Sequence, residues 1–232
     1  MNASASIAIS NPVIRRSGPF SLKLLLASFP EKTAKKGELI ARKNHNSDSI
    51  YFLNSGMVKS MSYVPERNKE VVDGYYTSGE LMNLENWNTN TSLHPSLKVT
   101  SSQAVYKVIP INEFRQLVLQ NQGLSQLVLQ SLSEKITKNK DRIHRLLLSK
   151  SRQRVIQFLM DYVEEVGQRV GYEYVIKKPF THDEMGQLSD TSRQTVTTVL
   201  NELKAANIIH FTRRYIVFRN LEQLADESKV NK

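Results

Sequence analysis

The chain contains no cysteine among its 232 residues. This absence excludes disulfide bridges, thiolate nucleophiles, zinc sites built on cysteine and iron–sulfur clusters held by cysteine. A cysteine-free chain is compatible with a reducing compartment, and we expect a cytoplasmic protein.

Long apolar segments are also missing. No run of eighteen or more apolar residues occurs, so we expect no membrane-spanning helix and no membrane partner. The amino-terminal segment MNASASIAIS has neither a basic region nor a long apolar core, which argues against a secretory signal peptide.

The residue sets on which most enzymes depend are absent as well. The sequence shows no set of nucleophile, base and orienting group, no spacing typical of a metal site, and no glycine-rich phosphate loop. We therefore expect a protein that is not an enzyme, and we predict no cofactor and no metal.

Positive charge is present in excess, with 32 Lys and Arg against 22 Asp and Glu and a net charge of +10. Such a balance favours polyanionic partners through Coulomb attraction and counterion release. The alternative is a charge that only keeps the protein in solution. The excess is larger in residues 1–149 than in residues 150–232, so net charge does not locate a binding surface.

Residues 29–109 have the texture of short strands. Apolar or alternating runs are separated by turn residues, which predicts an antiparallel sandwich or barrel. The segment YFLNSGMVKS is typical of a hairpin, because two apolar strands flank an Asn-Ser-Gly turn.

The texture changes to helix from Asn112. We expect one short helix that stops at Gly123 and a longer helix over residues 124–148. In the longer helix a narrow seam repeats at spacings of three and four, which favours a coiled-coil dimer over a helix packed on its own domain. A polar residue in such a seam typically fixes register. The seam consists of Leu129, Leu132, Ile136, Asn139, Ile143 and Leu146.

Two helices with a tight break follow in the last third of the chain. Thr181 and Glu184 have the spacing of a capping box, which starts a short helix. Ser189-Asp190-Thr191 makes the break, and a second helix runs over residues 192–206, capped by either Thr191 or Ser192. This pattern indicates a helix–turn–helix. The segment after it predicts a two-stranded wing that turns at Thr212-Arg213-Arg214, and we predict phosphate contacts by Arg213 and Arg214.

The start of the second helix is rich in threonine, which is a mediocre helix former. Short hydroxyl side chains let a helix tip approach base edges and phosphates in a major groove. Arg193 can pair with guanine and Gln194 with adenine. The alternative, a solvated and poorly helical surface, does not account for the capped helix before it or for the basic wing.

These residues resemble the family of the cyclic-AMP receptor protein and the fumarate–nitrate regulator (CRP/FNR), which are bacterial transcription factors. THDEMGQLSDTSRQTVTTVLNELKAANII is similar to the family's helix–turn–helix, YFLNSGMVKS to its β-roll signature, and residues 124–148 to its dimerisation helix. The resemblance implies an α+β fold: a cyclic-nucleotide-binding-like β-roll (jelly roll, 12–123), a long dimerisation helix (124–148) and a winged helix–turn–helix domain (149–232). It implies base reading by Arg193, Gln194 and Thr198, and phosphate contacts by Thr181, His182, Ser192 and Thr195.

Two kinds of departure from the family pattern bear on specificity and on the effector. The family's best-known members have Glu at the position of Gln194 and Arg at the position of Thr198. We therefore expect this protein to recognise a different operator sequence. The arginine that neutralises a cyclic phosphate is absent, which disfavours cyclic AMP, and the lack of cysteine disfavours an iron–sulfur cluster. Asn139 and Lys140 stand where nucleotide-binding members present small hydroxyls.

Other effector sites can be considered. His45 or His94 could ligate haem, but a lone loop histidine is more often polar surface, so haem is disfavoured. Aromatic residues could line an apolar effector pocket together with Lys140, or they could belong to the core of the roll. They are Tyr63, Tyr75, Tyr76 and Trp87.

The sequence therefore predicts a homodimeric regulator that binds a palindromic DNA operator and acts with RNA polymerase. The alternative is an interaction module whose winged helix no longer binds DNA.

Overall fold

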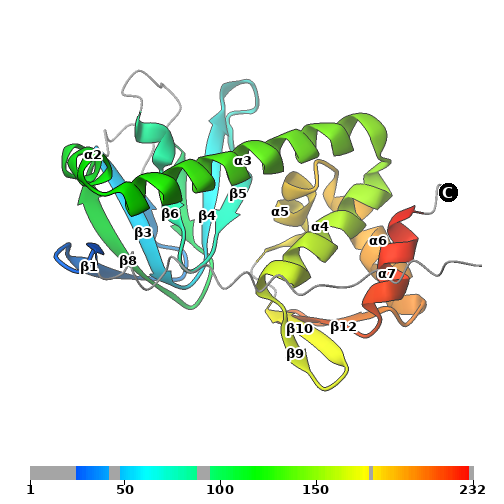
Figure 1. Cartoon of the computed structure of the whole chain (residues 1–232). Coiled ribbons are helices and arrows are strands. Elements are labelled where there is room, and N and C mark those ends of the chain that lie inside the picture. The colour runs from blue at the N-terminus through cyan, green and yellow to red at the C-terminus, as the bar shows by residue number, and fades with distance from the viewer. Residues whose placement is uncertain (1–24, 42–47, 88–94, 178–179, 230–232) are drawn as a thin grey trace, which may run out of the picture.

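Two antiparallel four-stranded sheets form the amino-terminal half of the molecule (Figure 1). The computed structural model describes residues 25–41, 48–87, 95–177 and 180–229. One sheet has the order β1-β8-β3-β6 and the other β2-β7-β4-β5. The strands are β1 (Glu31–Lys35), β2 (Leu39–Ala41), β3 (Ser49–Ser55), β4 (Val58–Val64), β5 (Lys69–Tyr76), β6 (Leu81–Met82), β7 (Ser96–Val99) and β8 (Gln103–Pro110), with 3₁₀ turns at Pro65–Arg67 and Leu84–Trp87.

The turn at Asn54-Ser55-Gly56 does not close a hairpin, so that prediction is wrong. β3 pairs with β8 and β6, whereas β4 pairs with β5 and β7. Gly56 has φ +101°, and a Cβ on it would lie 2.5 Å from the Gln103 carbonyl oxygen. The turn therefore packs tightly against the start of β8 and carries the chain from one sheet to the facing sheet.

The β-roll encloses an apolar core, as the alternating strands predict. Side chains from both sheets pack together in the space between the sheets. They include Leu53, Val58, Leu97 and Tyr106. A second group lies under the helices that follow the roll and includes Phe52, Ile109 and Phe114.

Two helices follow the roll. α2 (Ile111–Gln120) ends at Asn121, and α3 (Gln122–Leu148) begins directly after it. The side chain of Asn121 accepts a hydrogen bond of 2.9 Å from the Leu124 N–H and so caps α3. Gly123 lies inside α3, so the expected stop at Gly123 is wrong. The break comes from the extended backbone of Asn121.

The carboxy-terminal part is a helical domain with a four-stranded sheet of order β11-β12-β10-β9. Its elements are α4 (Ser151–Val166), β9 (Gln168–Val170), β10 (Glu173–Lys177), α5 (His182–Leu188), α6 (Arg193–Ala205), β11 (Ile209–Phe211), β12 (Tyr215–Phe218) and α7 (Leu221–Lys229). α7 was not predicted from the sequence; it packs on α4 and buries Leu224 in the domain core.

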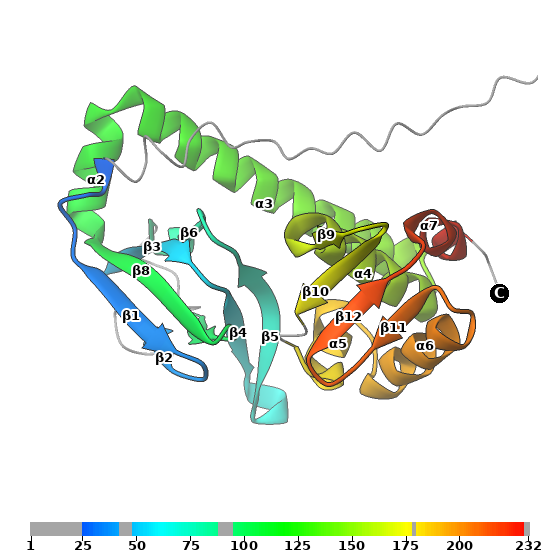
Figure 2. The ribbon, with the colours of Figure 1, turned by 90° about the horizontal axis from the view of Figure 1, so that it is seen from below.

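α3 runs alongside both the roll and the carboxy-terminal domain (Figure 2). Its seam lies on a face that the chain itself leaves exposed: Leu129 is 67% exposed, Ile136 61% and Ile143 55%. None of the described helices combines the length and the apolar composition that a membrane span requires.

Candidate nucleic-acid interface

α5 begins at the predicted capping box. The Thr181 hydroxyl accepts a hydrogen bond of 3.2 Å from the Glu184 N–H, and the Glu184 carboxylate accepts one of 2.7 Å from the Thr181 N–H. Both backbone donors at the helix start are thereby satisfied. Met185 is buried and anchors the helix in the domain core.

The break between α5 and α6 depends on a close approach of backbones at Gly186. A Cβ on Gly186 would lie 2.8 Å from the Thr191 carbonyl oxygen and 3.1 Å from the Ser192 carbonyl carbon. The Thr191 N–H donates a hydrogen bond of 2.7 Å to the Gly186 carbonyl oxygen. Asp190 takes the left-handed conformation, with φ +54°. These contacts fix the angle at which α6 leaves the turn.

α6 is capped by Ser192, which decides between the two predicted caps. Its side chain accepts a hydrogen bond of 3.0 Å from the Thr195 N–H, and the two hydroxyls lie 2.9 Å apart. One face of α6 is buried and carries Val196, Val199, Leu200 and Leu203. This apolar face packs the helix into the core of the domain.

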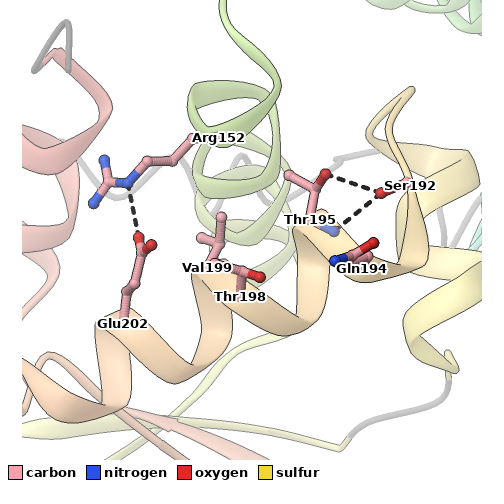
Figure 3. Close-up of a pocket in the computed structure, with 7 residues that line it drawn as sticks. All are labelled: Arg152, Ser192, Gln194, Thr195, Thr198, Val199 and Glu202. Atoms are coloured by element: carbon pink, nitrogen blue, oxygen red, sulfur yellow. Dashed lines mark hydrogen bonds and ion pairs between the residues drawn. The ribbon is translucent and has the colours of Figure 1, made fainter.

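The opposite face of α6 is open. Arg193, Gln194 and Thr198, the predicted base-reading residues, are all exposed. In Figure 3 the side chains of Gln194 and Thr198 lie along the same stretch of α6 as Ser192 and Thr195, and these residues line a shallow depression. The structure therefore brings together two of the three predicted base-reading residues, Gln194 and Thr198, and two of the predicted phosphate contacts, Ser192 and Thr195.

The remaining predicted phosphate contacts lie at the ends of neighbouring elements. Thr181 is exposed at the start of α5, and His182 is half-buried beside α6. Arg213 and Arg214 are exposed at the tip of the β11–β12 wing, where the Thr212 hydroxyl accepts hydrogen bonds of 3.1 Å from the N–H groups of Arg214 and Tyr215. The wing tip is thus a closed turn that presents two cations.

Arg152, at the start of α4, lines the same depression and had no role in the sequence interpretation (Figure 3). Its Nε lies 3.1 Å from a Glu202 carboxylate oxygen and its Nη2 lies 2.5 Å from one of Glu227. The guanidinium therefore joins α4, α6 and α7. No local pattern in the sequence pairs residues so far apart.

The five residues considered for an effector pocket do not converge within the chain. Tyr75 packs on Tyr162 and Phe180 at the edge of the carboxy-terminal domain. Burial and the nearby Glu165 carboxylate, which accepts its hydrogen bond, raise the pKa of Tyr75 above its ordinary value. The aromatic ring therefore belongs to a junction between the roll and that domain.

The other four candidates lie elsewhere. Tyr76 is buried in the core of the roll. The Tyr63 hydroxyl donates a hydrogen bond of 2.7 Å to Asn68 in the same hairpin. Trp87 packs edge-on against Phe114. Lys140 is exposed on α3. The two histidines considered as haem ligands, His45 and His94, lie outside the described residues.

Lys135, which the sequence interpretation missed, lies where α3 faces the roll. Its Nζ is 3.1 Å from the Tyr76 hydroxyl and 3.0 Å from a Glu85 carboxylate oxygen. Burial alone would lower the pKa of Lys135, but Tyr76 and Glu85 together raise it above its ordinary value. The chain thus places its own cation between the roll and α3.

Comparison with known proteins identifies both parts of this arrangement. Residues 31–121 match the family model of the cyclic nucleotide-binding domain, and residues 153–227 match that of the Crp-like helix-turn-helix domain. The chain belongs to the CRP/FNR family of transcription regulators. In this CRP/FNR protein the two matches coincide with the β-roll and with the helix–turn–helix domain.

Curated relatives and solved structures agree with the CRP/FNR assignment. The chain is 24% identical to the fumarate and nitrate reduction regulatory protein of Yersinia pestis, over 84% of this chain and 77% of that protein. It is 23% identical to the global nitrogen regulator of a Synechocystis species, over 78% and 80% of the two chains.

Two solved structures have the same fold. FixK2 of Bradyrhizobium japonicum has a TM-score of 0.72 at 16% identity, covering 85% of this chain and 96% of its own. A mutant of CooA from Carboxydothermus hydrogenoformans has a TM-score of 0.70 at 20% identity, covering 88% and 89%. The predicted CRP/FNR fold, with its β-roll, long helix and helix–turn–helix, is confirmed.

Proposed function

We propose that this CRP/FNR regulator binds a palindromic DNA operator as a homodimer and reads it with the tip of α6. The observation that carries the proposal is the division of α6 into a buried apolar face and an open polar face. Bases are read by Arg193, Gln194 and Thr198, whereas Thr181, His182, Ser192, Thr195, Arg213 and Arg214 contact phosphates.

The dimer forms through the exposed seam of α3. The seam consists of three leucines, two isoleucines and Asn139 on one stripe of the helix. Its five apolar side chains are between 37% and 67% exposed in the single chain. Asn139, itself exposed, lies in this stripe and sets the register of the pair. Two copies related by a twofold axis place their recognition helices roughly 34 Å apart, which is one turn of DNA.

The effector of this regulator is not cyclic AMP, haem or an iron–sulfur cluster. A cyclic phosphate needs a cation free to pair with it, whereas Lys135 is already bound by Tyr76 and Glu85. We further propose that the protein acts in the cytoplasm and contacts RNA polymerase, as expected of a transcription regulator. It performs no catalysis of its own.

The DNA contact can be tested with a matched pair of variants. Arg193→Ala removes a base-reading cation, and Arg115→Ala removes one positive charge from α2 of the roll. In fluorescence anisotropy titrations with an operator selected by the wild-type protein, Arg193→Ala should weaken binding by roughly 1–3 kcal/mol. Arg115→Ala should bind like the wild type. An equal loss of operator affinity in both variants would contradict base reading by Arg193.

Dimerisation and the effector need separate measurements. Leu132→Glu places a charge in the seam and should yield a monomer in sedimentation velocity, whereas Leu119→Glu on α2, outside the seam, should remain a dimer. Addition of cyclic AMP should leave operator affinity unchanged. A wild-type protein that enriches no duplex would favour an interaction module whose winged helix no longer binds DNA.

A further inference from the structure

The β-roll and the helix–turn–helix of the same chain are in direct contact. Strands β4 and β5 lie against α5: the Val72 N–H donates a hydrogen bond of 2.8 Å to the Gln187 side chain. Lys59 forms an ion pair with Glu184 in which both side chains are largely buried. Met57 and Tyr75 of the roll also pack against the core of the DNA-binding domain. The two domains therefore meet through a continuous polar and apolar surface.

Arg142 of α3 joins this surface to the turn of the helix–turn–helix. Its Nε and Nη2 lie 2.8 and 2.7 Å from the two carboxylate oxygens of Asp190, a bidentate pair. The same guanidinium donates hydrogen bonds of 3.0 Å to the Asp73 carbonyl oxygen on β5 and 3.2 Å to the Gln187 carbonyl oxygen on α5. One side chain thus connects the dimer helix, the roll and the turn.

A second arginine holds the same turn from the other side. Arg154 of α4 donates hydrogen bonds of 3.3 Å to the Ser189 carbonyl oxygen and 2.8 Å to the Asp190 carbonyl oxygen. Arg154 also donates a hydrogen bond of 2.7 Å to the Ser149 carbonyl oxygen at the end of α3. Both arginines therefore connect the turn to α3, but of the two only Arg142 lies on α3 itself, next to Ile143 of the seam, and also bonds β5 of the roll.

We propose that Arg142 is a positioning residue: it fixes the recognition helix relative to the dimer seam and so sets the operator spacing that the dimer accepts. α6 begins three residues after Asp190, and Ile143 of the seam is the neighbour of Arg142 in the chain. A change in the roll that moves β5 reaches the turn through the same guanidinium. The effect on operator spacing rests on the proposed function. The connection that Arg142 makes between α3, the roll and the turn does not depend on it.

The chemistry of the contact requires an arginine. A planar fork bound at two points fixes an angle as well as a distance, which an ammonium group cannot do. The partner also suits its place, because Asp and Asn tolerate the left-handed conformation that Asp190 adopts. Asp190→Asn therefore removes the charge and keeps the backbone, and it provides a second variant on the other side of the pair.

The test measures how strongly DNA binding depends on the spacing between the two half-sites of the operator. Wild-type protein, Arg142→Ala and Asp190→Asn are titrated with the selected operator and with operators whose half-sites are one or two base pairs closer or farther apart. Lys69→Ala is the control, because it removes one positive charge and an exposed ion pair with Asp183 from the same domain contact. The wild type and the control should reject altered spacings, whereas the two variants should lose this discrimination by about fivefold or more.

Arg142→Lys should lose discrimination as well, because it keeps the charge but not the fork. Unchanged discrimination in Arg142→Ala or Asp190→Asn would overturn the proposal, and unchanged discrimination in Arg142→Lys would overturn the bidentate role. A mutation that only weakened folding would lower affinity for all spacings alike, and this result too would count against positioning.

Amide hydrogen exchange without DNA tests the mechanical link separately. Arg142→Ala should accelerate exchange in α5 and β5, with α4 and the roll core protected as in the wild type. Unchanged protection of α5 would overturn the link. If the wild type bound no operator at all, the proposed function would fail, and the exchange measurement would still decide whether Arg142 holds the turn.

Discussion

The imidazole of His182 lies against the hydroxyl of Thr197, with Nδ1 3.0 Å from Oγ1, and so joins the first helix of the helix–turn–helix to the recognition helix. The same hydroxyl donates a hydrogen bond of 2.9 Å to the Arg193 carbonyl oxygen. Its single proton is then used, so Nδ1 of His182 must be the donor in the first contact. The start of α5 and the start of α6 are therefore held together by one chain of hydrogen bonds.

Replacement of Thr197 by valine should loosen this connection. The change keeps the shape but removes the acceptor for His182, and we expect a loss of about 1 kcal/mol of unfolding free energy. Urea denaturation measures it. Thr198→Val, at the exposed neighbouring position, should change stability by no more than about 0.5 kcal/mol. Thr198→Val should instead alter the DNA sequence that the protein prefers. Equal stability of Thr197→Val and the wild type would contradict the connection.

Variants of Ser192 separate folding from DNA binding. Ser192→Ala loses the cap on α6 and should lower the unfolding free energy by about 1 kcal/mol. Ser192→Asp keeps an oxygen that caps the helix, so its stability should be close to that of the wild type, but its charge should repel a phosphate. Thermal unfolding and anisotropy titrations measure the two effects. Normal DNA affinity in Ser192→Asp would show that no phosphate lies at this position.

Gly186 should not tolerate even the smallest side chain. In Gly186→Ala the new Cβ would overlap the Thr191 carbonyl oxygen, and we expect destabilisation of roughly 1–3 kcal/mol. Gly74→Ala on β5 is the control, because its added Cβ meets no atom within 4 Å. Denaturant titration compares the two variants. A cost in Gly74→Ala as large as that in Gly186→Ala would contradict the explanation by close approach.

The ion pair between Lys59 and Glu184 should give stability a dependence on acid pH. Burial opposes the charge of Glu184, but hydrogen bonds from Lys59 and from the Thr181 N–H lower its pKa below the ordinary value of 4.5. A carboxylate with a lowered folded pKa contributes stability that is present above the unfolded value and is lost as pH falls through the folded one.

Glu184→Gln should therefore be less stable than the wild type at pH 7, and the difference should shrink as pH falls below about 4.5. Urea denaturation at a series of pH values measures it. A difference that does not change with pH would contradict the lowered pKa.

Local features of this chain could be predicted from the sequence. The capping box of Thr181 and Glu184, the break after Ser189 and the open face of α6 each depend on residues a few positions apart. The strand texture and the seam of α3 are periodic and could be recognised in the same way. The sequence does not distinguish Thr191 from Ser192 as the cap of α6, because both residues have a hydroxyl and only the backbone conformation decides.

Features that depend on distant residues could not be predicted. Arg142 and Asp190 are 48 positions apart, and Lys59 and Glu184 are 125 apart, so no spacing rule connects them. The residues around Gly56 are typical of a hairpin turn, but the sequence does not show which sheet each strand joins, so it could not reveal that the chain crosses to the facing sheet there. Tyr75 was expected in an effector pocket or in the roll core, but it packs at the junction with the DNA-binding domain.

Selection of bound duplexes from a random pool, carried out with the wild type and with Gln194→Glu, tests the central claim most directly. The account predicts a palindrome with half-sites one turn apart. Gln194→Glu should change one position in both half-sites, from adenine to cytosine, because a carboxylate accepts a hydrogen bond from cytosine N4. The same enriched sequence from both proteins, or no enrichment by the wild type, would contradict the claim that α6 reads DNA.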